Sequence, residues 1–329
     1  MPTRQKVIIT DHDFADIELE REILEKAGAQ VIALQAKSEQ DLLEHAADCA
    51  AMINQYAYIG ASTIAAMQRC KVIARYGVGT DIVDVAAATA KGIQVTNVRN
   101  YCTEEVADHA ISLWLALARG LFAYDRATHR GEWRWQTAAP LNRLRGQTVG
   151  IVSFGAIGQA IAQRAKAFGA QVIIHDPYVD SATIAAHQVA AVDKGALLAE
   201  SDVVMMQVPM TTETRHFLSE EEFRSMKPNA LVICTGRGPT IDNRALYKAL
   251  SEGWIAGAGL DDPEEEPAKR KHWSPNDNPL FSLPNVIVTP HAAYYSEESL
   301  RAARTIAAQE VARVLTGQAP LNPVNTPAR

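Results

Sequence analysis

The stretch VGIVSFGAIG, residues 149–158, decides how the rest of the chain is interpreted. A run of apolar residues leads into a glycine-containing turn and then into a helical pattern. A strand, a tight turn and a helix in this order can bind the pyrophosphate of a dinucleotide at the helix N-terminus. Gly155 would let the backbone approach the phosphates, and Gly158 would let the helix pack against the strand. Ser153 replaces the first glycine of the usual GxGxxG pattern, so an ordinary tight turn is the alternative.

An acidic residue follows this turn at an informative distance. The next apolar stretch, residues 171–175, is predicted to be a strand and ends in Asp176. Roughly 20 residues beyond the glycine turn is where a carboxylate binds the ribose hydroxyls of the adenosine. A carboxylate there repels a 2′-phosphate, which favours NAD over NADP. The alternative is that Asp176-Pro177 only ends a strand.

Short apolar strands alternate with amphipathic helices along the whole chain, which predicts an α/β fold of parallel, doubly wound sheets. Strands are expected at residues 6–10, 30–34, 50–53 and 71–74, and then at 148–153, 171–175, 202–207, 230–235, 255–259 and 286–289. Helices are expected at residues 17–27, 39–47, 62–68, 157–168, 194–199, 219–226, 243–252 and 297–315, with one continuous helix over 103–130. Residues 261–284 are expected to be irregular.

Length and composition limit the class of protein. The 329 residues suggest two domains, and 47% hydrophobic with 21% charged residues excludes a disordered chain. No apolar run approaches the roughly 18 residues of a membrane-spanning helix, and no signal peptide is evident. A net charge of -6 argues against nucleic acid as a partner. We therefore expect a cytoplasmic protein with no membrane partner.

The four cysteines, Cys49, Cys70, Cys102 and Cys234, are far apart in the sequence and form no metal-binding motif. They are expected to be buried, inert thiols in a reducing compartment. No metal is expected. A site built from Glu264, Glu265, Glu266 and His291 is the alternative.

Polar residues follow three of the predicted strands in the second half of the chain. Arg237 follows the strand at 230–235, an acidic cluster follows the strand at 255–259, and His291 follows the strand at 286–289. In a doubly wound sheet, ligands bind at the carboxyl ends of the strands. An arginine, an acid and a histidine at one edge suit the binding of an oxo-acid and general acid/base catalysis.

Several ordered motifs together resemble the D-isomer-specific 2-hydroxyacid dehydrogenases. They are RYGVGTD (75–81), SFGAIG (153–158), SDVVMMQVPMTTETRHFL (201–218), MKPNALVICTGRG (226–238), AGLDDPEEEP (258–267) and TPHAA (289–293). HDPYVD (175–180) and HAAYYSEESL (291–300) are most similar to the branch of the C-terminal binding proteins, which are NAD(H)-binding transcriptional corepressors.

The resemblance implies an NAD-dependent enzyme that interconverts a 2-oxo acid and its D-2-hydroxy acid. It implies two doubly wound, Rossmann/flavodoxin-like domains, with the cofactor domain inserted in a discontinuous substrate domain. Residues 1–99 and 292–329 would form the substrate-binding domain, and residues 100–291 the NAD-binding domain. It also implies a homodimer in which the helix from Thr103 contributes to the interface.

The resemblance also implies roles for individual residues. Arg237 would anchor the substrate, and His291 would be the general acid/base. Glu266 would pair with His291. A neighbouring carboxylate raises the pKa of an imidazole, so the pairing would favour the protonated ring. The backbone N–H groups of Val78 and Gly79 would bind the substrate carboxylate, and Tyr294 would lie near a bulky or aromatic 2-oxo acid.

The implied cofactor-binding residues are Thr103, Gly155, Ala156, Ile157, Gly158, Asp176, Val208, Thr214, Thr235 and Asp261. Among them, Asp261 would face the nicotinamide carboxamide.

Two further points stay open from the sequence. An NADH-sensing, corepressor-like binding protein with the same fold is the alternative function, and the absence of a basic nuclear-localisation run favours the enzyme. Trp133 and Trp135 flank Arg134 and are expected to pack between the domains, with an exposed stacking surface as the alternative.

Overall fold

The computed structural model describes residues 5–264 and 272–327. The chain forms two compact units. Unit 1 consists of Met1–Tyr101 and Ser296–Arg329, and unit 2 consists of Cys102–Tyr295. The sequence predicted breaks after residues 99 and 291.

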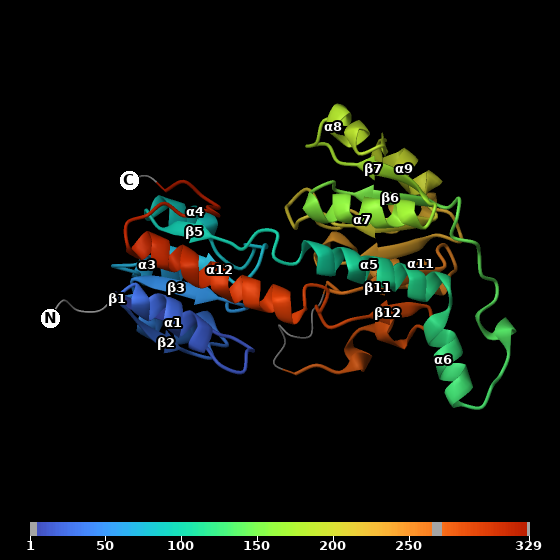
Figure 1. Cartoon of the computed structure of the whole chain (residues 1–329). Coiled ribbons are helices and arrows are strands. Elements are labelled where there is room, and N and C mark those ends of the chain that lie inside the picture. Colours follow the sequence, from blue (N-terminus) through green and yellow to red (C-terminus); the bar gives the residue numbers. More distant parts are fainter. Residues whose placement is uncertain (1–4, 265–271, 328–329) are drawn as a thin grey trace. The chain divides into compact units, whose positions relative to one another are not determined.

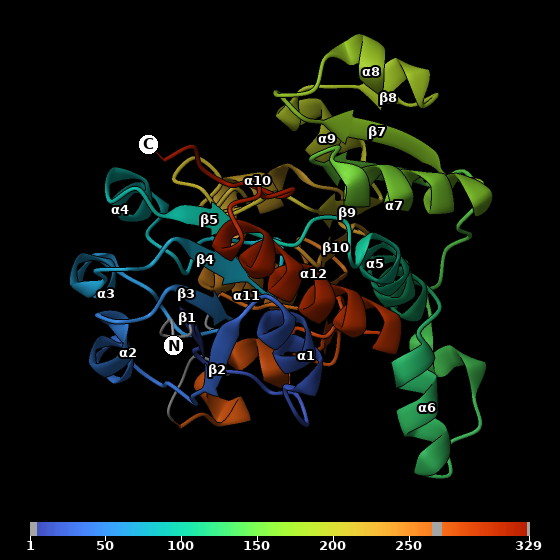
Figure 2. The same ribbon diagram turned by 60° about the vertical axis from the view of Figure 1, so that its left-hand side comes forward.

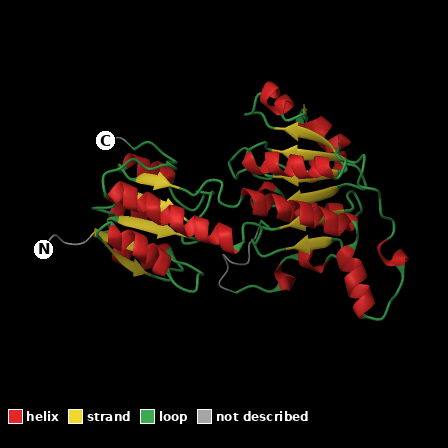
Figure 3. Cartoon of the chain, in the orientation of Figure 1, coloured by secondary structure: helices red, strands yellow, loops and turns green. Residues whose placement is uncertain are grey.

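Unit 1 is built on a five-stranded sheet in the order β2-β1-β3-β4-β5, with every pair parallel. Figures 1 and 3 show this sheet with helices on its two faces. Its strands are β1 (Gln5–Ile9), β2 (Ala29–Ala33), β3 (Ala51–Asn54), β4 (Val72–Arg75) and β5 (Gln94–Thr96). Its helices are α1 (Glu18–Lys26), α2 (Glu39–Ala46), α3 (Ala61–Ala66), α4 (Val85–Ala90) and α12 (Glu297–Leu315).

The helices of unit 1 bury two separate apolar clusters against the sheet. Helices α1 and α12 lie beside each other on one face and cover Val7, Ile9, Ile53 and Val72. Helices α2, α3 and α4 cover the other face, as the turned view in Figure 2 shows. The alternation of β-strand side chains therefore sends neighbouring residues to opposite cores.

Two elements of unit 1, α4 and β5, are absent from the sequence prediction. Strand β5 has only three residues, and its outer edge pairs with residues of the C-terminal tail. Thr96 forms an antiparallel bridge with Pro323, and the Val95 N–H donates to the Asn325 side chain at 2.7 Å. Contacts this distant in sequence leave no local periodicity to detect.

A buried ion pair joins the two helices that come from opposite ends of the chain. Glu20 on α1 is fully buried, and its carboxylate accepts from Arg304 Nε at 2.8 Å and from Arg304 Nη2 at 2.7 Å. The Tyr76 hydroxyl donates to the same carboxylate at 3.1 Å. Burial, together with the negative charge of Glu20, raises the pKa of Tyr76 well above its usual value.

Unit 2 is built on a seven-stranded parallel sheet in the order β12-β11-β10-β9-β6-β7-β8. Its strands are β6 (Thr148–Val152), β7 (Gln171–His175), β8 (Ala190–Ala191), β9 (Val203–Met206), β10 (Leu231–Cys234), β11 (Gly257–Leu260) and β12 (Val286–Val288). Its α-helices are α5 (Thr103–Ala118), α6 (Leu121–His129), α7 (Ala156–Ala167), α8 (Ser181–Ala186), α9 (Lys194–Glu200), α10 (Glu220–Ser225) and α11 (Asn243–Ser251).

Helices also cover both faces of the sheet in unit 2 (Figure 3). Helices α5 and α7 bury Trp114, Val149 and Ile161 on one face, whereas α9, α10 and α11 bury Leu197, Phe223 and other residues on the opposite face. The strand order reverses between β6 and β9, which is where this topology places a ligand, beyond the carboxyl ends of the strands. The predicted α/β class with parallel, doubly wound sheets is confirmed.

The prediction of one helix over residues 103–130 is wrong. Helix α5 ends at Ala118 and α6 begins at Leu121, with a bend of 60° between them. Gly120 takes a left-handed backbone conformation, φ 63°, which a continuing helix cannot contain. Within residues 5–264 and 272–327, no single helix is long and apolar enough to cross a membrane. The bent pair α5 and α6 reaches that length and composition only when the two are joined.

Other differences from the prediction are smaller. Helix α8 and strand β8 were not predicted. The segment expected to be irregular, residues 261–284, contains two short 3₁₀ helices in its described part, Pro275–Asp277 and Pro279–Ser282. Two more 3₁₀ helices, Trp135–Ala138 and Gly238–Thr240, lie elsewhere in unit 2.

Replacing Glu20 by Ala should destabilise unit 1. The change leaves the Arg304 guanidinium without its buried carboxylate, a loss that costs about 3–5 kcal/mol of unfolding free energy. Chemical denaturation of the variant and the wild type measures this difference in unfolding free energy. Glu22→Ala on the same helix is the matched control, since the Glu22–Lys26 ion pair is exposed, and it should leave the midpoint unchanged. Equal midpoints for both variants would show that the buried pair contributes nothing.

Candidate active site

The glycine turn after β6 has the geometry that the sequence motif predicts. Ser153 has φ 80°, so it takes the left-handed conformation that a glycine usually supplies at this position. A Cβ added at Gly158 would lie 2.3 Å from the Ser153 carbonyl oxygen, whereas one added at Gly155 would meet no atom within 4 Å. Gly158 is therefore needed for close packing of helix and strand, and Gly155 faces open space at the start of α7. Ala156 and Ile157 form the first turn of that helix.

Asp176 lies directly beside this turn. One carboxylate oxygen accepts from the Phe154 N–H at 2.7 Å, and the other accepts from the Tyr178 N–H at 2.9 Å. The carboxylate is thus held at the carboxyl end of β7, next to the N-terminus of α7. The Tyr178 hydroxyl donates to Glu213 at 2.8 Å, and this hydrogen bond raises the pKa of Tyr178.

Three of the remaining predicted cofactor-binding residues follow β9 and β10. Val208 is buried two residues beyond β9, and the Thr214 hydroxyl donates to the Pro209 carbonyl at 2.6 Å. Thr235 follows β10 and accepts from the Gln207 side-chain amide at 2.8 Å. Thr103 begins α5. Their contacts with a cofactor stay predictions.

Arg237 lies just beyond β10, in a turn that packs tightly against the segment after β11. A Cβ at the next residue, Gly238, would approach the Pro263 backbone to 2.3 Å and the Asp262 carbonyl oxygen to 2.4 Å. The half-buried Arg237 therefore lies beside the start of the acidic segment, at the same sheet edge as the glycine turn.

Asp261 organises the loop that carries His291. Its side chain is 2% exposed, and one oxygen accepts from the Thr289 hydroxyl at 2.6 Å and the Ala292 N–H at 2.9 Å. The other oxygen accepts from the Ala293 N–H at 2.9 Å. The Asp261 carbonyl accepts from the His291 N–H at 2.7 Å. Asp261, the first residue after β11, thus binds four of the five residues 289–293 that follow β12.

The His291 backbone is held in an uncommon conformation, with φ 53°. The hydrogen bonds from the residues around it to Asp261 maintain this conformation. The ring of Tyr294 meets the imidazole edge-to-face, with centroids 6.2 Å apart. The structure therefore places Tyr294 beside His291, and its contact with a substrate stays a prediction.

His109 and Thr289 are residues of this site that sequence reasoning missed. The Thr289 hydroxyl gives its proton to Asp261, so it accepts from His109 Nε2 at 2.9 Å. His109 lies in the middle of α5, far from the other residues in sequence, and carries no motif. Only its position on the helix face that packs against β11 identifies it.

Glu266, the predicted partner of His291, lies outside the described residues. The last described residue before it, Glu264, accepts from His216 Nε2 at 2.6 Å and from Arg215 Nη2 at 3.1 Å. Among the described residues no group of three or more His, Cys, Asp or Glu side chains could hold a metal ion.

In unit 1, two side chains donate hydrogen bonds to the backbone of the predicted substrate-binding turn, Val78 and Gly79. Arg75 Nε donates to the Gly79 carbonyl at 2.9 Å, and Asn97 Nδ2 donates to the Val78 carbonyl at 2.7 Å. Nearby, the buried Asp11 carboxylate accepts from the N–H of Tyr56 at 2.7 Å. These groups lie at the carboxyl ends of β1, β3 and β4, and substrate binding by Val78 and Gly79 stays a prediction.

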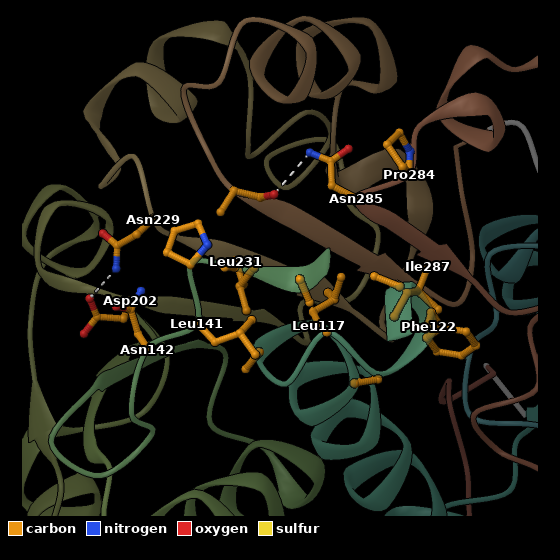
Figure 4. A pocket seen from close by; sticks show the side chains of 18 of the residues that line it. Leu117, Phe122, Leu141, Asn142, Asp202, Asn229, Leu231, Pro284, Asn285 and Ile287 are labelled. Atoms are coloured by element: carbon orange, nitrogen blue, oxygen red, sulfur yellow. Dashed lines mark hydrogen bonds between the residues drawn. The ribbon is translucent and has the colours of Figure 1, made fainter. Parts of the chain in front are cut away.

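A cavity of about 480 Å³ lies at the opposite, amino end of the unit 2 sheet (Figure 4). Leu117, Phe122, Leu141, Leu231 and Ile287 line it, so it is not the site formed by Arg237 and His291. Trp133 and Trp135 do not pack within unit 2, where they are 89% and 72% exposed, and their packing between the domains stays a prediction.

Known proteins match both the sequence and the fold. Residues 111–293 match the model of the family described as D-isomer specific 2-hydroxyacid dehydrogenase, NAD binding domain. A glyoxylate reductase of Korarchaeum cryptofilum is 39% identical over 88% of this chain and 86% of that enzyme. A D-3-phosphoglycerate dehydrogenase of Methanocaldococcus jannaschii is 38% identical over 98% of this chain, which spans 60% of that enzyme.

Among solved structures, the D-lactate dehydrogenase of Aquifex aeolicus, in complex with NAD and lactic acid, superposes with a TM-score of 0.89. It is 28% identical and matches 98% of this chain and 100% of its own. None of these relatives carries the name of a C-terminal binding protein, so that branch stays a prediction.

Thr289→Val should destabilise unit 2 through the loss of the hydroxyl between Asp261 and His109. A hydrogen bond to a buried carboxylate is worth about 1.5–3 kcal/mol, and the unfolding free energy should fall by that amount. Thr289→Ser keeps the hydroxyl and should stay close to wild type. If denaturant curves place the two variants together, the hydroxyl does not support this loop.

Proposed function

The chain belongs to the D-isomer-specific 2-hydroxyacid dehydrogenases, and on this premise we propose that it reduces a 2-oxo acid to the D-2-hydroxy acid with Arg237, Glu266 and His291 as its catalytic residues. The enzyme is NAD-dependent. The observation that supports the proposal most directly is the position of Arg237 and His291. They follow β10 and β12, the two strands that flank β11, at the sheet edge that carries the glycine turn.

The residues of unit 2 fit NAD. The open space at Gly155, at the N-terminus of α7, leaves room for a pyrophosphate. The Asp176 carboxylate, held beside this turn, suits the two hydroxyls of an adenosine ribose and opposes a 2′-phosphate. Bound NADH supplies the hydride for reduction of the substrate carbonyl.

Arg237 and His291 would have different roles toward the substrate: Arg237 would bind it, and His291 would transfer a proton. A guanidinium binds a carboxylate through two parallel hydrogen bonds, so Arg237 would orient the 2-oxo acid. His291 would donate a proton to the ketone oxygen as charge develops there, and would accept that proton in the reverse direction. Glu266 would favour the protonated imidazole. Asp261, through its bonds to Ala292, Ala293 and the His291 N–H, would keep the imidazole in place.

The substrate side chain is the finer part of the proposal. The relatives include enzymes named glyoxylate reductase, which act on a small 2-oxo acid. Tyr294 offers an aromatic ring beside His291, and we propose that the pocket also accepts bulky or aromatic 2-oxo acids. Turnover of glyoxylate and pyruvate but of no larger 2-oxo acid would reject this part alone.

The assembly is also a proposal. We expect two copies to associate through the surface around α6 that exposes Trp133 and Trp135. A homodimer buries such aromatic side chains, which are otherwise unfavourable in water. The corepressor-like function, the cytoplasmic location and the absence of nucleic-acid and membrane partners stay predictions from the sequence.

His291→Ala should lower kcat by roughly 10²–10⁴-fold, the usual contribution of a positioned general acid. NADH oxidation with a panel of 2-oxo acids of different size measures this, and NADH binding, followed by fluorescence, should stay unchanged. His45→Ala is the matched control, because His45 is a half-buried histidine on α2 of unit 1 to which no part of the proposal assigns a role. An unchanged kcat in His291→Ala would remove this residue from the mechanism.

Two glycine variants separate cofactor binding from folding. Gly155→Ala places a methyl group in the open space at α7 and should weaken NADH binding at wild-type stability. Gly158→Ala forces its methyl group against the Ser153 carbonyl and should lower the melting temperature. NADH titration and thermal denaturation of both variants test this. If Gly155→Ala binds NADH normally, the pyrophosphate does not approach at this point.

A further inference from the structure

Two of the four cysteines, which the sequence suggested to be isolated and inert, meet in unit 1. Cys49 lies between α2 and β3, and Cys70 lies between α3 and β4. Both pack in the same apolar cluster, beneath the helices α2, α3 and α4. We propose that Cys49 and Cys70 form a reversible disulfide when a peroxide oxidises the protein, which makes this pair a redox modification site.

The backbone on both sides of the pair sets the spacing that a disulfide needs. The Gln68 N–H donates to the Ala47 carbonyl at 3.3 Å, and the Lys71 N–H donates to the Ala50 carbonyl at 2.9 Å. These two hydrogen bonds join residues with the same sequence offset as Cys49 and Cys70, and the β3–β4 register continues that offset. Neighbouring strands lie about 4.8 Å apart. This spacing falls within the roughly 4.4–6.8 Å between Cα atoms of disulfide-bonded cysteines.

The side chains of the pair both lie in one apolar cluster. Cys49 is fully buried, whereas Cys70 is partly exposed at the edge of the same cluster. The Cys49 thiol also contacts the Ala46 carbonyl at 3.2 Å, and the Cys70 thiol contacts the Val72 carbonyl at 3.4 Å. The two sulfur atoms are therefore held by the backbone, and only Cys70 presents a route for an oxidant.

The electrostatic setting divides the roles of the two thiols. The hydrogen bond from Cys70 lowers the pKa of Cys49, while that same contact and burial raise the pKa of Cys70. Lys6 and Asp48, which form an ion pair at 2.8 Å, are the charged groups that act on Cys49. Cys49 is thus the better thiolate, and Cys70 is the more accessible sulfur.

The chemistry balances with hydrogen peroxide as the oxidant. The Cys49 thiolate attacks the O–O bond of a peroxide that enters past the partly exposed Cys70, and it forms a sulfenic acid with release of one water. The neighbouring Cys70 sulfur then attacks the Cys49 sulfur, forms the S–S bond and displaces hydroxide, which takes up the Cys70 thiol proton and leaves as a second water. The two thiols lose two electrons and two protons, and the peroxide is reduced to water. A thiol reductant reverses the process by exchange.

The native wild-type enzyme is treated with hydrogen peroxide at a low molar excess, quenched and alkylated, and its cysteines are mapped by mass spectrometry. We expect a cross-linked peptide pair containing Cys49 and Cys70, which dithiothreitol reverses. Cys102 and Cys234 are the internal controls. Both are buried, and burial raises the pKa of Cys234 to about 12, so both should keep their thiols.

Single substitutions show which of the two cysteines reacts with the peroxide first. In Cys70→Ser the sulfenic acid on Cys49 has no partner and should be trapped by dimedone, whereas in Cys49→Ser the raised pKa of Cys70 should keep its thiol reduced and no cross-link should form. The oxidised wild type should also melt at a higher temperature than the reduced protein, because the cross-link restricts the unfolded chain. Neither variant should show this difference.

The wild-type experiment alone can overturn the proposal. If all four cysteines remain alkylatable after oxidation, or if the cross-link maps to another pair or joins two chains, Cys49 and Cys70 are not a redox pair. If sulfinic acid accumulates on Cys49 without a disulfide, the backbone holds the sulfur atoms too rigidly to react, and the proposal also fails.

Discussion

The buried carboxylate of Asp261 is the constraint on which the candidate site of unit 2 depends. A carboxylate accepts several hydrogen bonds but donates none, so three donors from residues 289–293 can converge on it at once. Their convergence brings the loop after β12 against the end of β11 and holds His291 at a positive φ. The imidazole therefore takes its position from a neighbouring strand rather than from its own loop.

Much of this arrangement could be predicted because its signals are local. The turn at 153–158, the ribose-binding position of Asp176 and the polar residues after β10 and β12 each lie within a few residues of an apolar strand, where period and motif can be recognised. Parallel topology then brings the carboxyl ends of these strands to one edge. Arg237 and His291 could be named as candidates because of that rule rather than because of any contact visible in the sequence.

What the sequence could not reveal depends on partners that are distant along the chain. Thr289 lies at the end of a predicted strand and its role depends on His109, which α5 brings to it. Strand β5 is too short to show a period and is completed by Pro323. Cys49 and Cys70 belong to separate connections and meet only through the register of β3 and β4. Gly120 is the exception, because a glycine inside a long helical pattern is itself a local signal for the end of a helix.

The discontinuity of unit 1 also has a consequence for how the chain is made. Glu20 and its buried partner Arg304 are separated by 284 positions, so nearly the whole protein leaves the ribosome before the pair can form. Domains fold as units during translation, and unit 2 is complete by Tyr295, before α12 has been synthesised. Until then, the N-terminal part of unit 1 keeps Glu20 hydrated. The faces of β1, β3 and β4 that α12 later covers stay exposed to solvent. During this interval a chaperone has the most apolar surface to bind.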